Sequence, residues 1–368
     1  MDNERFKQQR LVVTDEKIFA QRRQWLKQLG AGGAMLAGLG GAGDSMGEAA
    51  GLTQISGKQA LSRSTKKMLR PGITDKKLLG YFPAKTNKLF QGKGLKLTKQ
   101  ITAASYNNFY EFLPGQGGPV WRHVDKFVVE PWKIKVHGLC AKPKTFDLDD
   151  LFKLGLEERV YHFRCVETWA MNIPWTGFAL HKLLKKVAPL AGAKYVRFKC
   201  LKRPKQMPGM AQAMAQNWGY PWPYYEALRI DEAMNELAML VTGVYGQALP
   251  KQHGAPIRMI VPWKYGYKSP KSIVEIELLK DKPKTFWTQA SNGAYVHEYG
   301  FLSNVNPNIA HPRWSQKWSR MLQPGVSSRQ GTRVPTQIFN GYGKYVAKLY
   351  PKEPIKPIAT LKPGQIAR

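Results

Sequence analysis

Short apolar runs and alternations of apolar with polar residues begin near residue 101. Helical periodicity is rarer, occurring at Ala179–Val187 and roughly at Tyr224–Met234. Because strands and helices do not alternate regularly, the pattern predicts an α+β fold with mixed β-sheets, long coil connections and few helices, rather than a doubly wound fold. The predicted strands are Trp132–Val136, Val160–Val166, Tyr195–Cys200, Met239–Val244, Ile257–Val261 and Ile273–Leu279.

Outside this patterned region the chain changes character at both ends. We divide it into an N-terminal signal region at 1–50, a basic extended arm at 51–100, a folded domain at 101–345 and a basic C-terminal tail at 346–368. Gly and Pro interrupt the arm, where no apolar period persists, so it is expected to wrap over the core. The stretch 301–368 is rich in Pro and Asn and is expected to form ordered irregular coil.

The signal region contains the pair Arg22–Arg23 ahead of a weakly apolar, Gly/Ala-rich stretch. Trp25 and Leu26 follow the pair, and no apolar run reaches the roughly 18 residues that a spanning helix needs. This arrangement predicts a twin-arginine signal. It indicates that the twin-arginine machinery exports the protein to the periplasm already folded, as cofactor-containing proteins commonly are. The alternative is an amphipathic helix that ends in a flexible glycine linker.

The charge of the chain is strongly one-sided. The sequence has 57 Lys and Arg against 25 Asp and Glu, a formal net charge of +32. Residues 58–99 contribute +11, and residues 301–368 contribute +10. Such an excess predicts attraction to a polyanionic surface, which leaves nucleic acid, an anionic membrane face and an acidic protein partner as candidates.

Three cysteines, Cys140, Cys165 and Cys200, form no CxxC pair and are too few for a disulfide framework. Cys165 follows a predicted strand and lies beside Arg164, whose charge favours the thiolate that ligates soft metals. The alternative is a buried structural cysteine. We find no HExxH motif, no P-loop and no GxGxxG after a strand.

Longer phrases around Cys165 resemble a known family. They are SYNNFYEF (105–112), LEERVYHFRCVETWAM (156–171), WTGFALHKLL (175–184), GVYGQALP (243–250), HGAPIRMIVPWKYGYK (253–268), YGF (299–301), NVNP (304–307) and HPRWSQ (311–316). In this order they resemble the catalytic subunits of periplasmic molybdopterin-dependent protein-methionine-sulfoxide reductases, of the sulfite oxidase superfamily. The resemblance implies a sulfite-oxidase-type molybdopterin-binding domain over 101–345.

The resemblance implies one Mo-molybdopterin per chain, with the Cys165 thiolate as the metal ligand. Arg and Lys supply cationic donors to the cofactor phosphate, and backbone N–H groups of a turn can cradle it. The cofactor-binding residues implied by position are Asn107, Asn108, Tyr110, Glu111, Cys200, His253, Arg258, Ser269, Pro270 and Lys271.

Three positions depart from related patterns. Cys200 stands where the family has Thr, and His253 stands where it has Asn before Gly-Ala-Pro, so the contacts of these two residues with the pterin are open. Cys200 is expected to remain a free thiol, because a disulfide with Cys165 would prevent metal binding.

Glu167 follows Cys165 where sulfite oxidases carry an Ala-Gly-Asn-Arg-type run, which favours a neutral sulfoxide over an anionic substrate. A monomer is expected, since the C-terminal segment does not match the dimerisation domain of sulfite oxidases.

The implied activity is transfer of the oxygen of methionine sulfoxide to reduced molybdenum. Glu167 relays a proton, or it contacts the groups around the metal without binding the metal itself, or it only pairs with Arg164. Tyr299 and Trp314 line the substrate region or belong to the core. Because the chain has no haem-attachment CxxCH and no iron–sulfur cysteine set, electrons would come from a haem-containing inner-membrane subunit. The substrates would be oxidised periplasmic proteins.

Two other functions compete with this one. A sulfite-oxidising enzyme or another S- or N-oxide reductase of the superfamily would share the same motifs. A basic polyanion-binding protein would explain the charge directly, but the basic residues form no stripe with interleaved aromatic residues. No nucleic-acid partner is therefore expected.

Overall fold

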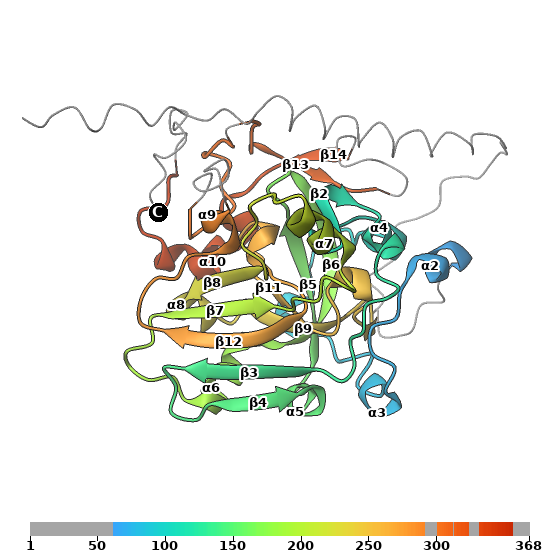
Figure 1. Ribbon diagram of the computed structural model, residues 1–368. Coiled ribbons are helices and arrows are strands. Elements are labelled where there is room, and N and C mark those ends of the chain that lie inside the picture. Colours follow the sequence, from blue (N-terminus) through green and yellow to red (C-terminus); the bar gives the residue numbers. More distant parts are fainter. Residues whose placement is uncertain (1–61, 291–299, 312, 324–330, 356–368) are drawn as a thin grey trace, which may run out of the picture. The chain divides into compact units, whose positions relative to one another are not determined.

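The computed structural model describes residues 62–290, 300–311, 313–323 and 331–355, so the predicted signal with Arg22 and Arg23 lies outside the described residues. The strands of the described part form one seven-stranded, one five-stranded and one two-stranded sheet (Figure 1). They are β1 Asn107–Phe109, β2 Leu113–Gly118, β3 Lys133–Gly138, β4 Lys144–Asp147, β5 Glu157–Arg164, β6 Trp169–Ala179, β7 Tyr195–Cys200, β8 Tyr225–Arg229, β9 Met239–Val244, β10 Gln247–Ala248, β11 Arg258–Ile260, β12 Ile273–Leu279, β13 Trp318–Met321 and β14 Thr332–Pro335.

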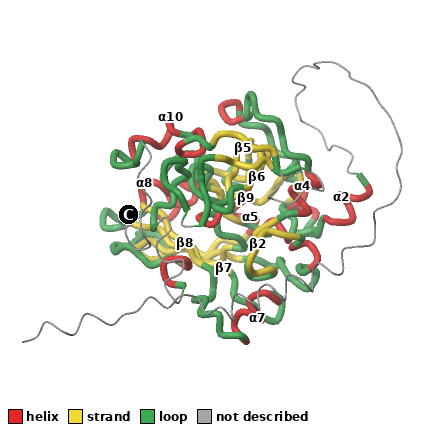
Figure 2. Tube along the Cα trace, turned by 90° about the horizontal axis from the view of Figure 1, so that it is seen from above, coloured by secondary structure: helices red, strands yellow, loops and turns green. Residues whose placement is uncertain are grey.

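The helices are short, and several lie at the periphery around the strands in Figure 2. In the described ranges, none is long and apolar enough to cross a bilayer. The α-helices are α2 Arg63–Met68, α3 Lys76–Leu79, α4 Gln100–Ser105, α5 Leu148–Phe152, α6 Leu180–Val187, α7 Pro208–Ala215, α8 Ile230–Ala233, α9 Phe286–Gln289 and α10 Gly343–Val346. The 3-10 turns are η1 Lys88–Phe90, η2 Val120–Arg122, η3 Lys251–His253, η4 Gly266–Lys268, η5 Ile338–Gly341 and η6 Ala347–Leu349.

Strand β6 is the centre of the seven-stranded sheet. It pairs antiparallel with β5 and β9 and parallel with β13, and all eleven of its residues are buried. A strand covered on both faces has no polar alternation, which is why the apolar pattern did not reveal it. The long β5–β6 hairpin therefore runs through the core.

The five-stranded sheet has the order β4-β3-β12-β7-β8. Strand β12 is parallel to β3 and antiparallel to β7, so this sheet is mixed as well. The residues of β7 alternate between buried and half-buried, because one face of the sheet packs on the core and the other meets solvent. The mixed sheets and few helices confirm the predicted fold class.

The six strands predicted from the apolar pattern all occur, as β3, β5, β7, β9, β11 and β12. The predicted helix near Ala179–Val187 is α6, whose buried residues recur with a helical period and whose last turn carries Lys185 and Lys186. The local pattern was sufficient for β7 and α6 because each has one buried face. Strands β9 and β11 are buried along their whole length and show as short apolar runs.

Two predictions were wrong. The helix predicted at Tyr224–Met234 is strand β8 followed by the four-residue helix α8, because pairing with β7 extends its first half. The stretch 301–368, expected to be irregular coil, contains β13 and β14, which pair with each other through Arg320 and Arg333 among others. In both cases, pairing with a distant strand overrides the local preference.

The described part of the basic arm follows the β5–β6 hairpin. The Asn87 N–H donates to the Glu158 carbonyl at 2.8 Å, and the Thr98 N–H donates to the Asn172 carbonyl at 3.0 Å. Short helices α2 and α3 interrupt the arm, and their N-caps are the side chains of Ser62 and Asp75. The arm thus satisfies its backbone groups on the core.

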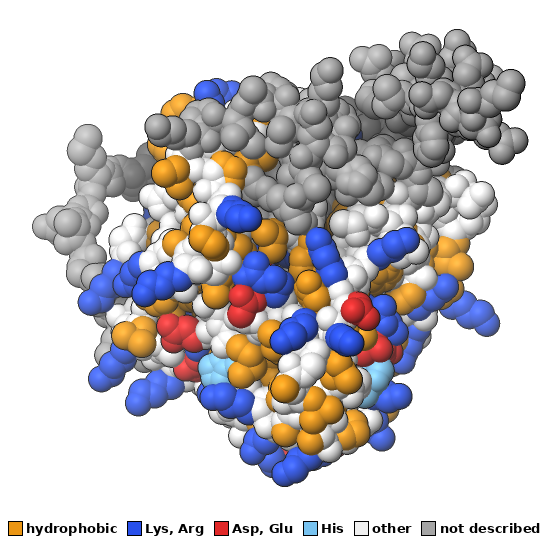
Figure 3. All heavy atoms as spheres, turned by 90° about the vertical axis from the view of Figure 1, so that its left-hand side faces the viewer, with side chains coloured by type: hydrophobic (Ala, Val, Ile, Leu, Met, Phe, Trp, Pro, Cys, Tyr) orange, Lys and Arg blue, Asp and Glu red, His pale blue; other side chains and the backbone are white. Residues whose placement is uncertain are grey.

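Lysine and arginine side chains are spread over the face shown in Figure 3, with fewer acidic side chains among them. Most ion pairs between the described residues are exposed or half-exposed, as for Lys77 with Asp149 and Arg229 with Asp231. Exposed pairs contribute little to the free energy of unfolding. The Lys and Arg side chains in excess over Asp and Glu give the surface a positive field that can attract an anionic partner.

Candidate active site

Cys165 lies at the tip of the β5–β6 hairpin. The register pairs Arg164 with Ala170, which leaves residues 165–168 as the turn. The Cys165 N–H donates to the Trp169 carbonyl at 2.9 Å, and the Thr168 N–H donates to the Cys165 carbonyl at 3.1 Å. Thr168 has a φ of 77°, which is strained for a β-branched residue. The turn fixes the cysteine at the end of two buried strands.

Residues of the C-terminal segment hold this turn from the other side. The Arg164 guanidinium donates to Ser319 Oγ at 2.8 Å and to Gln316 Oε1 at 2.7 Å. The Val166 carbonyl accepts from Trp314 Nε1 at 3.0 Å and from Gln316 Nε2 at 2.8 Å. Because Arg164 is fully buried, these bonds form in a medium where they are strong. The turn that carries Cys165 is therefore clamped to the segment 314–319.

The thiol of Cys165 is 4 % exposed. Its Sγ accepts from Asn108 Nδ2 and from the Glu167 N–H, each at 3.5 Å. Burial, followed by the charge of Glu167, raises the pKa of the thiol well above its usual range. Arg164 lowers this pKa, as its charge predicts, but burial and the charge of Glu167 outweigh it. The Arg164 guanidinium donates to the Cys165 carbonyl and to groups of residues 316–319. A coordinated metal ion would displace the proton outright.

The hairpin tip opens into a cavity of about 170 Å³, large enough for a ligand rather than a single water. The structure brings most of the predicted site residues to its wall. They are Asn107, Asn108, Tyr110, Glu111, Cys165, Glu167, His253, Arg258, Ser269, Pro270, Lys271 and Trp314. Tyr299 lies outside the described residues.

Cys200 is not among the residues that line the cavity. It is 2 % exposed at the end of β7 and packs with Tyr224 and Phe286. The Lys271 N–H donates to its thiol, and burial raises the pKa of that thiol. All three cysteines are free thiols. Contact of Cys200 with a cofactor stays a prediction, and its position behind Lys271 is that of a supporting residue.

Several polar atoms on the cavity wall have no partner in the described part of the chain. They include Asn107 Oδ1, Asn108 Oδ1 and His253 Nε2, all buried. A buried acceptor without a donor costs free energy, so such atoms indicate a ligand that supplies donors and acceptors. A pterin ring offers both along its edge. These residues therefore fit the cofactor that the sequence implied.

Two cationic side chains, Arg258 and Lys271, lie on the same wall. Arg258 is 4 % exposed and donates to the carbonyls of His253 at 3.0 Å and Ser269 at 3.3 Å. Burial lowers the pKa of Arg258 to about 9 and that of Lys271 to about 7. Within the described ranges no carboxylate forms an ion pair with either residue. Two adjacent cations that form no direct ion pair suit a phosphate dianion.

The negative charge of the Glu111 carboxyl acts on Lys271. Glu111 is 3 % exposed, and burial raises its pKa to about 7, opposed by the charge of Lys271. The Glu111 carbonyl accepts from the Met210 N–H at 2.8 Å, which ties this residue to α7. The Glu111 carboxyl lines the cavity, where it can keep a proton or accept a hydrogen bond from a ligand.

Glu167 faces the cavity beside Cys165. Its carboxylate accepts from Trp169 Nε1 at 3.1 Å and from the Asn108 side chain, and burial raises its pKa. Arg164 donates to other groups, so the alternative in which Glu167 only neutralises Arg164 was wrong. An acidic residue therefore lies beside the predicted metal ligand, and its N–H donates to the Cys165 thiol at 3.5 Å.

Aromatic side chains form the outer wall. The rings of His311 and Trp314 stack at 3.5 Å between centroids, and Arg313 lies over the Trp314 ring at 5.1 Å. Tyr106 and Trp169 meet edge to face at 5.3 Å. Sequence reasoning missed Tyr106, Trp169, His311 and Arg313 as site residues although each lies in a quoted motif. It also missed Tyr267, which lies in the quoted motif 253–268, and Tyr224 and Trp287, which lie in none.

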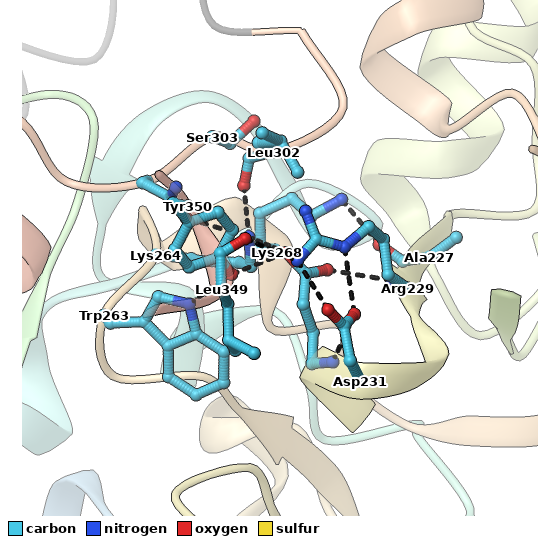
Figure 4. A network of polar contacts seen from close by, with 12 residues as sticks. Ala227, Arg229, Asp231, Trp263, Lys264, Lys268, Leu302, Ser303, Leu349 and Tyr350 are labelled. Atoms are coloured by element: carbon cyan, nitrogen blue, oxygen red, sulfur yellow. Dashed lines mark hydrogen bonds and ion pairs between the residues drawn. The ribbon is translucent and has the colours of Figure 1, made fainter. Parts of the chain in front are cut away.

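A buried polar network supports the loop that leads to Ser269–Pro270–Lys271 (Figure 4). Lys264 Nζ lies 2.7 Å from Glu232 Oε1, and Lys268 Nζ lies 2.7 Å from Glu226 Oε2. Tyr350 donates to Glu232 and accepts from Trp263 Nε1 at 2.8 Å. Buried pairs of this kind specify one arrangement more than they stabilise it. The C-terminal segment thereby fixes residues 263–268.

Comparison with known proteins connects this site to one chemistry. Residues 120–287 match the family model described as oxidoreductase molybdopterin binding domain. The chain is 50 % identical over 257 residues to the protein-methionine-sulfoxide reductase catalytic subunit MsrP of Burkholderia mallei, covering 69 % of this chain and 74 % of that protein. It is 48 % identical over 256 residues to the protein of the same name from Xanthomonas campestris pv. campestris, covering 69 % and 76 %.

A solved structure also matches part of the chain. It is the sulfane dehydrogenase SoxCD from Paracoccus pantotrophus, with a TM-score of 0.34 and 17 % identity, covering 41 % of this chain and 38 % of that one. The relatives at about half identity are the informative comparison.

Proposed function

Because the chain belongs to the family of protein-methionine-sulfoxide reductase catalytic subunits, we propose that it reduces methionine sulfoxide, free or within proteins, to methionine. The protein is a molybdopterin-dependent oxidoreductase that acts on a sulfur group. The overall reaction consumes two electrons and two protons and releases a thioether and water. The observation that carries the proposal is a cavity that joins a thiol, two cations that form no direct ion pair and an aromatic outer wall.

The residues divide into cofactor and substrate sides. Cys165 would hold molybdenum, and Arg258 with Lys271 would hold the phosphate of the pterin. When bound, the cofactor supplies a metal that accepts an oxygen atom and stores two electrons. Asn107 and His253 face the cavity with unpartnered polar atoms and would bind the pterin edge.

The substrate side suits a neutral sulfoxide with an apolar arm. Trp314 and Trp169 present rings, and a sulfur–aromatic contact is worth about 0.3–1.5 kcal/mol. Glu167 sits next to Cys165 and disfavours an anion such as sulfite at that point. We assign the Glu167 carboxyl the role of passing a proton to the substrate oxygen, since Trp169 and Asn108 hold it at the cavity.

We further propose a periplasmic location after export by the twin-arginine machinery, supported by Arg22 and Arg23. The relatives are named catalytic subunits, which supports a separate electron donor. We propose that this donor is a haem-containing inner-membrane subunit and that oxidised periplasmic proteins are the substrates. The protein would then repair methionine oxidation in exported proteins.

Metal analysis and turnover with a dye donor test the activity. The purified protein should contain about one molybdenum per chain, as expected for a single ligand cysteine. It should reduce methionine sulfoxide faster than dimethyl sulfoxide and should not oxidise sulfite. Protein free of molybdenum that binds DNA in a salt-dependent way would contradict the proposal. Faster turnover of sulfite would assign the chain to the other branch of the superfamily.

A further inference from the structure

The last two strands of the seven-stranded sheet carry basic and aromatic side chains on one face. Strand β14 is outermost and pairs with β13, which sets Trp318 opposite Pro335 and Arg320 opposite Arg333 (Figure 1). Alternate residues of a strand and residues directly opposite each other share a face. Trp318, Arg320 and Arg333 therefore lie on one face, which we call the cationic face. Trp318 is 46 % exposed, Arg333 is exposed and Arg320 is half-buried.

The two arginines of the cationic face stand where their charges repel. Residues directly opposite each other in an antiparallel pair have Cβ atoms about 5 Å apart, and like charges at such positions destabilise the pair. Among the residues that the structure describes, neither Arg320 nor Arg333 has a side-chain hydrogen bond or ion pair, and the sequence 301–352 contains no Asp or Glu. A carboxylate between the two guanidinium groups would replace the repulsion with charge-assisted hydrogen bonds.

The strand that carries the cationic face is also bonded to the turn that carries the predicted metal ligand. The Arg320 N–H donates to the Thr168 carbonyl at 2.8 Å. On the other side of Cys165, the Arg164 guanidinium donates to the Trp318 carbonyl at 3.1 Å. A partner on the cationic face is thus connected to the Cys165 turn through one strand and its hydrogen bonds.

The cationic face begins beside the cavity and leads away from it. Strand β13 is parallel to β6, and the register pairs Arg320 with Trp169, whose side chain lines the cavity. Trp169, Arg320 and Arg333 therefore form a row across three strands, from the cavity wall to the edge of the sheet. A partner bound to the outer part of this row approaches the site and leaves the cavity to the substrate.

The residue types of the cationic face select a protein with an acidic surface. Trp and Arg are the residues most enriched at the energetic centres of protein interfaces, and fixed cations speed the encounter with a complementary negative patch. Oxidised substrate proteins differ in charge, so one fixed set of cations does not suit them all. An electron donor, in contrast, presents the same surface at every encounter.

We propose that the cationic face is the docking surface for an acidic patch on the protein that donates electrons to this enzyme. This inference rests on the proposed function, because it places the donor of that reaction on the molecule. It assigns donor recognition to Arg320 and Arg333 rather than to the net charge of the chain. Substrate binding and the chemistry at Cys165 do not depend on either side chain.

The double variant Arg320→Gln/Arg333→Gln tests the assignment in the cofactor-loaded enzyme. Right-side-out inner-membrane vesicles from the source bacterium, reduced with a soluble quinol, serve as the donor, and quinol without vesicles gives the background. At low salt and with enzyme below saturation, vesicle-driven reduction of methionine sulfoxide should fall about tenfold. With a dye donor, kcat and KM for methionine sulfoxide should stay within about twofold, since neither side chain lines the cavity.

Two further variants are matched controls. Arg320→Lys/Arg333→Lys keeps both charges and should retain the vesicle-driven rate within about twofold. Lys133→Gln/Lys135→Gln removes the same charge from two exposed positions of β3 in the five-stranded sheet and should also retain it. An unchanged rate of the Arg→Gln variant, or an equal loss in the Lys133/Lys135 variant, would overturn the assignment. An equal loss with the dye donor would show a structural role instead.

Anionic lipid is the other surface that these cations could meet. Sedimentation with protein-free phosphatidylglycerol vesicles measures it directly. Binding should weaken no more for Arg320→Gln/Arg333→Gln than for Lys133→Gln/Lys135→Gln, because removal of two charges changes the total charge equally in both. A weaker binding confined to the arginine variant, equal to its loss of vesicle-driven rate, would assign the face to lipid and refute a protein partner.

A binding measurement without turnover separates this inference from the proposed function. Fluorescently labelled enzyme should bind the native vesicles about tenfold more tightly than the same vesicles treated with protease, and Arg320→Gln/Arg333→Gln should abolish this difference. If methionine sulfoxide is reduced with neither donor but the difference persists, the proposed function fails and the docking face stands. If dye-driven turnover is normal and the arginine variant binds and accepts electrons as the parent does, only the docking face fails.

Discussion

Single residues at the site are recognisable by charges and polar atoms that the protein leaves uncompensated. Arg258 is buried with only carbonyl partners, and His253 Nε2 is buried with no partner in the described structure. Folding alone gives no benefit from such groups, so a bound ligand is the physical reason for them. Cys165 is the one cysteine that the structure places at the cavity wall.

Replacing the predicted metal ligand should abolish activity without loss of the fold. Cys165→Ser is nearly isosteric, so thermal unfolding of the cofactor-free protein should shift by less than about 5 °C. Reduction of methionine sulfoxide should fall more than about a hundredfold, since even residues behind a metal ligand cost 10–100-fold. Cys140→Ser changes a buried thiol away from the cavity and should keep parental activity. A Cys165→Ser enzyme that turns over at the parental rate would refute the ligand assignment.

The neutral state of His253 should make stability sensitive to acid. Burial lowers its pKa from 6.5 to about 3, so between these values the unfolded chain holds a proton that the folded protein lacks. Stability therefore rises with pH in this window, and it falls by about 2 kcal/mol when cofactor-free protein is taken from pH 7 to pH 5. Denaturant unfolding at the two pH values measures this loss.

The variant His253→Asn carries no titrating group and should lose about 2 kcal/mol less than the parent over the same change. His123→Asn is the control, because the pKa of this exposed histidine is lowered less than that of His253, and it should keep most of the parent's pH dependence. Equal pH dependence of His253→Asn and the parent would show that His253 is charged in the folded state.

At the scale of elements, the β5–β6 hairpin and the segment around β13 form one mechanical unit. The Arg320 N–H donates to the Thr168 carbonyl at 2.8 Å, and β13 adds to β6 in parallel. Together with the Arg164 bonds, this pairing holds the turn despite the positive φ of Thr168. The family model ends at residue 287, so this support comes from outside the matched domain.

Arg164→Lys should loosen the turn. Lysine keeps the charge but cannot reach Gln316, Ser319 and the Trp318 carbonyl from one planar group. We expect a loss of about 2–4 kcal/mol in unfolding free energy, as for a broken buried network, together with reduced activity at normal molybdenum content. An altered electron paramagnetic resonance spectrum of Mo(V) would report the displaced ligand. Arg320→Lys, half-buried on β13, should change neither property.

At the scale of the whole molecule, most of the positive charge comes from two stretches of the sequence other than the one that carries Cys165. Of the net charge of +32, the arm 58–99 and the stretch 301–368 supply +11 and +10. On the face in Figure 3, Lys and Arg side chains are more widespread than Asp and Glu side chains. Charge in this distribution steers association with an anionic surface rather than taking part in catalysis.

Electron transfer from the proposed membrane donor should therefore weaken with salt. Exposed charges are screened over about 8–10 Å at physiological ionic strength, so the rate of reduction by donor-containing membranes should fall as NaCl rises from 20 to about 300 mM. Turnover with a small neutral dye donor is the control and should stay constant. A salt-independent rate with membranes would exclude an electrostatic role for the basic segments in docking.

Local pattern was enough where an element has one buried face or where a motif is contiguous. The alternation in Tyr195–Cys200 and the helical period in Leu180–Val187 each reflect a single solvent boundary. The turn Cys165–Thr168 and the loop with Asn107 and Asn108 could be assigned because their site residues are neighbours in sequence.

The sequence by itself determined the α+β class, six of the strands and the cysteine that the cavity presents. Only the tertiary structure decided that Arg164 bonds to residues 152 and 155 positions away, that burial outweighs its effect on the thiol pKa, and that β6 lies in the core. It also decided that Trp287 joins Tyr110 at the cavity wall. The reason is physical: local periodicity reports which face of an element is buried, whereas a side chain's partner depends on chain segments brought together only by long-range pairing.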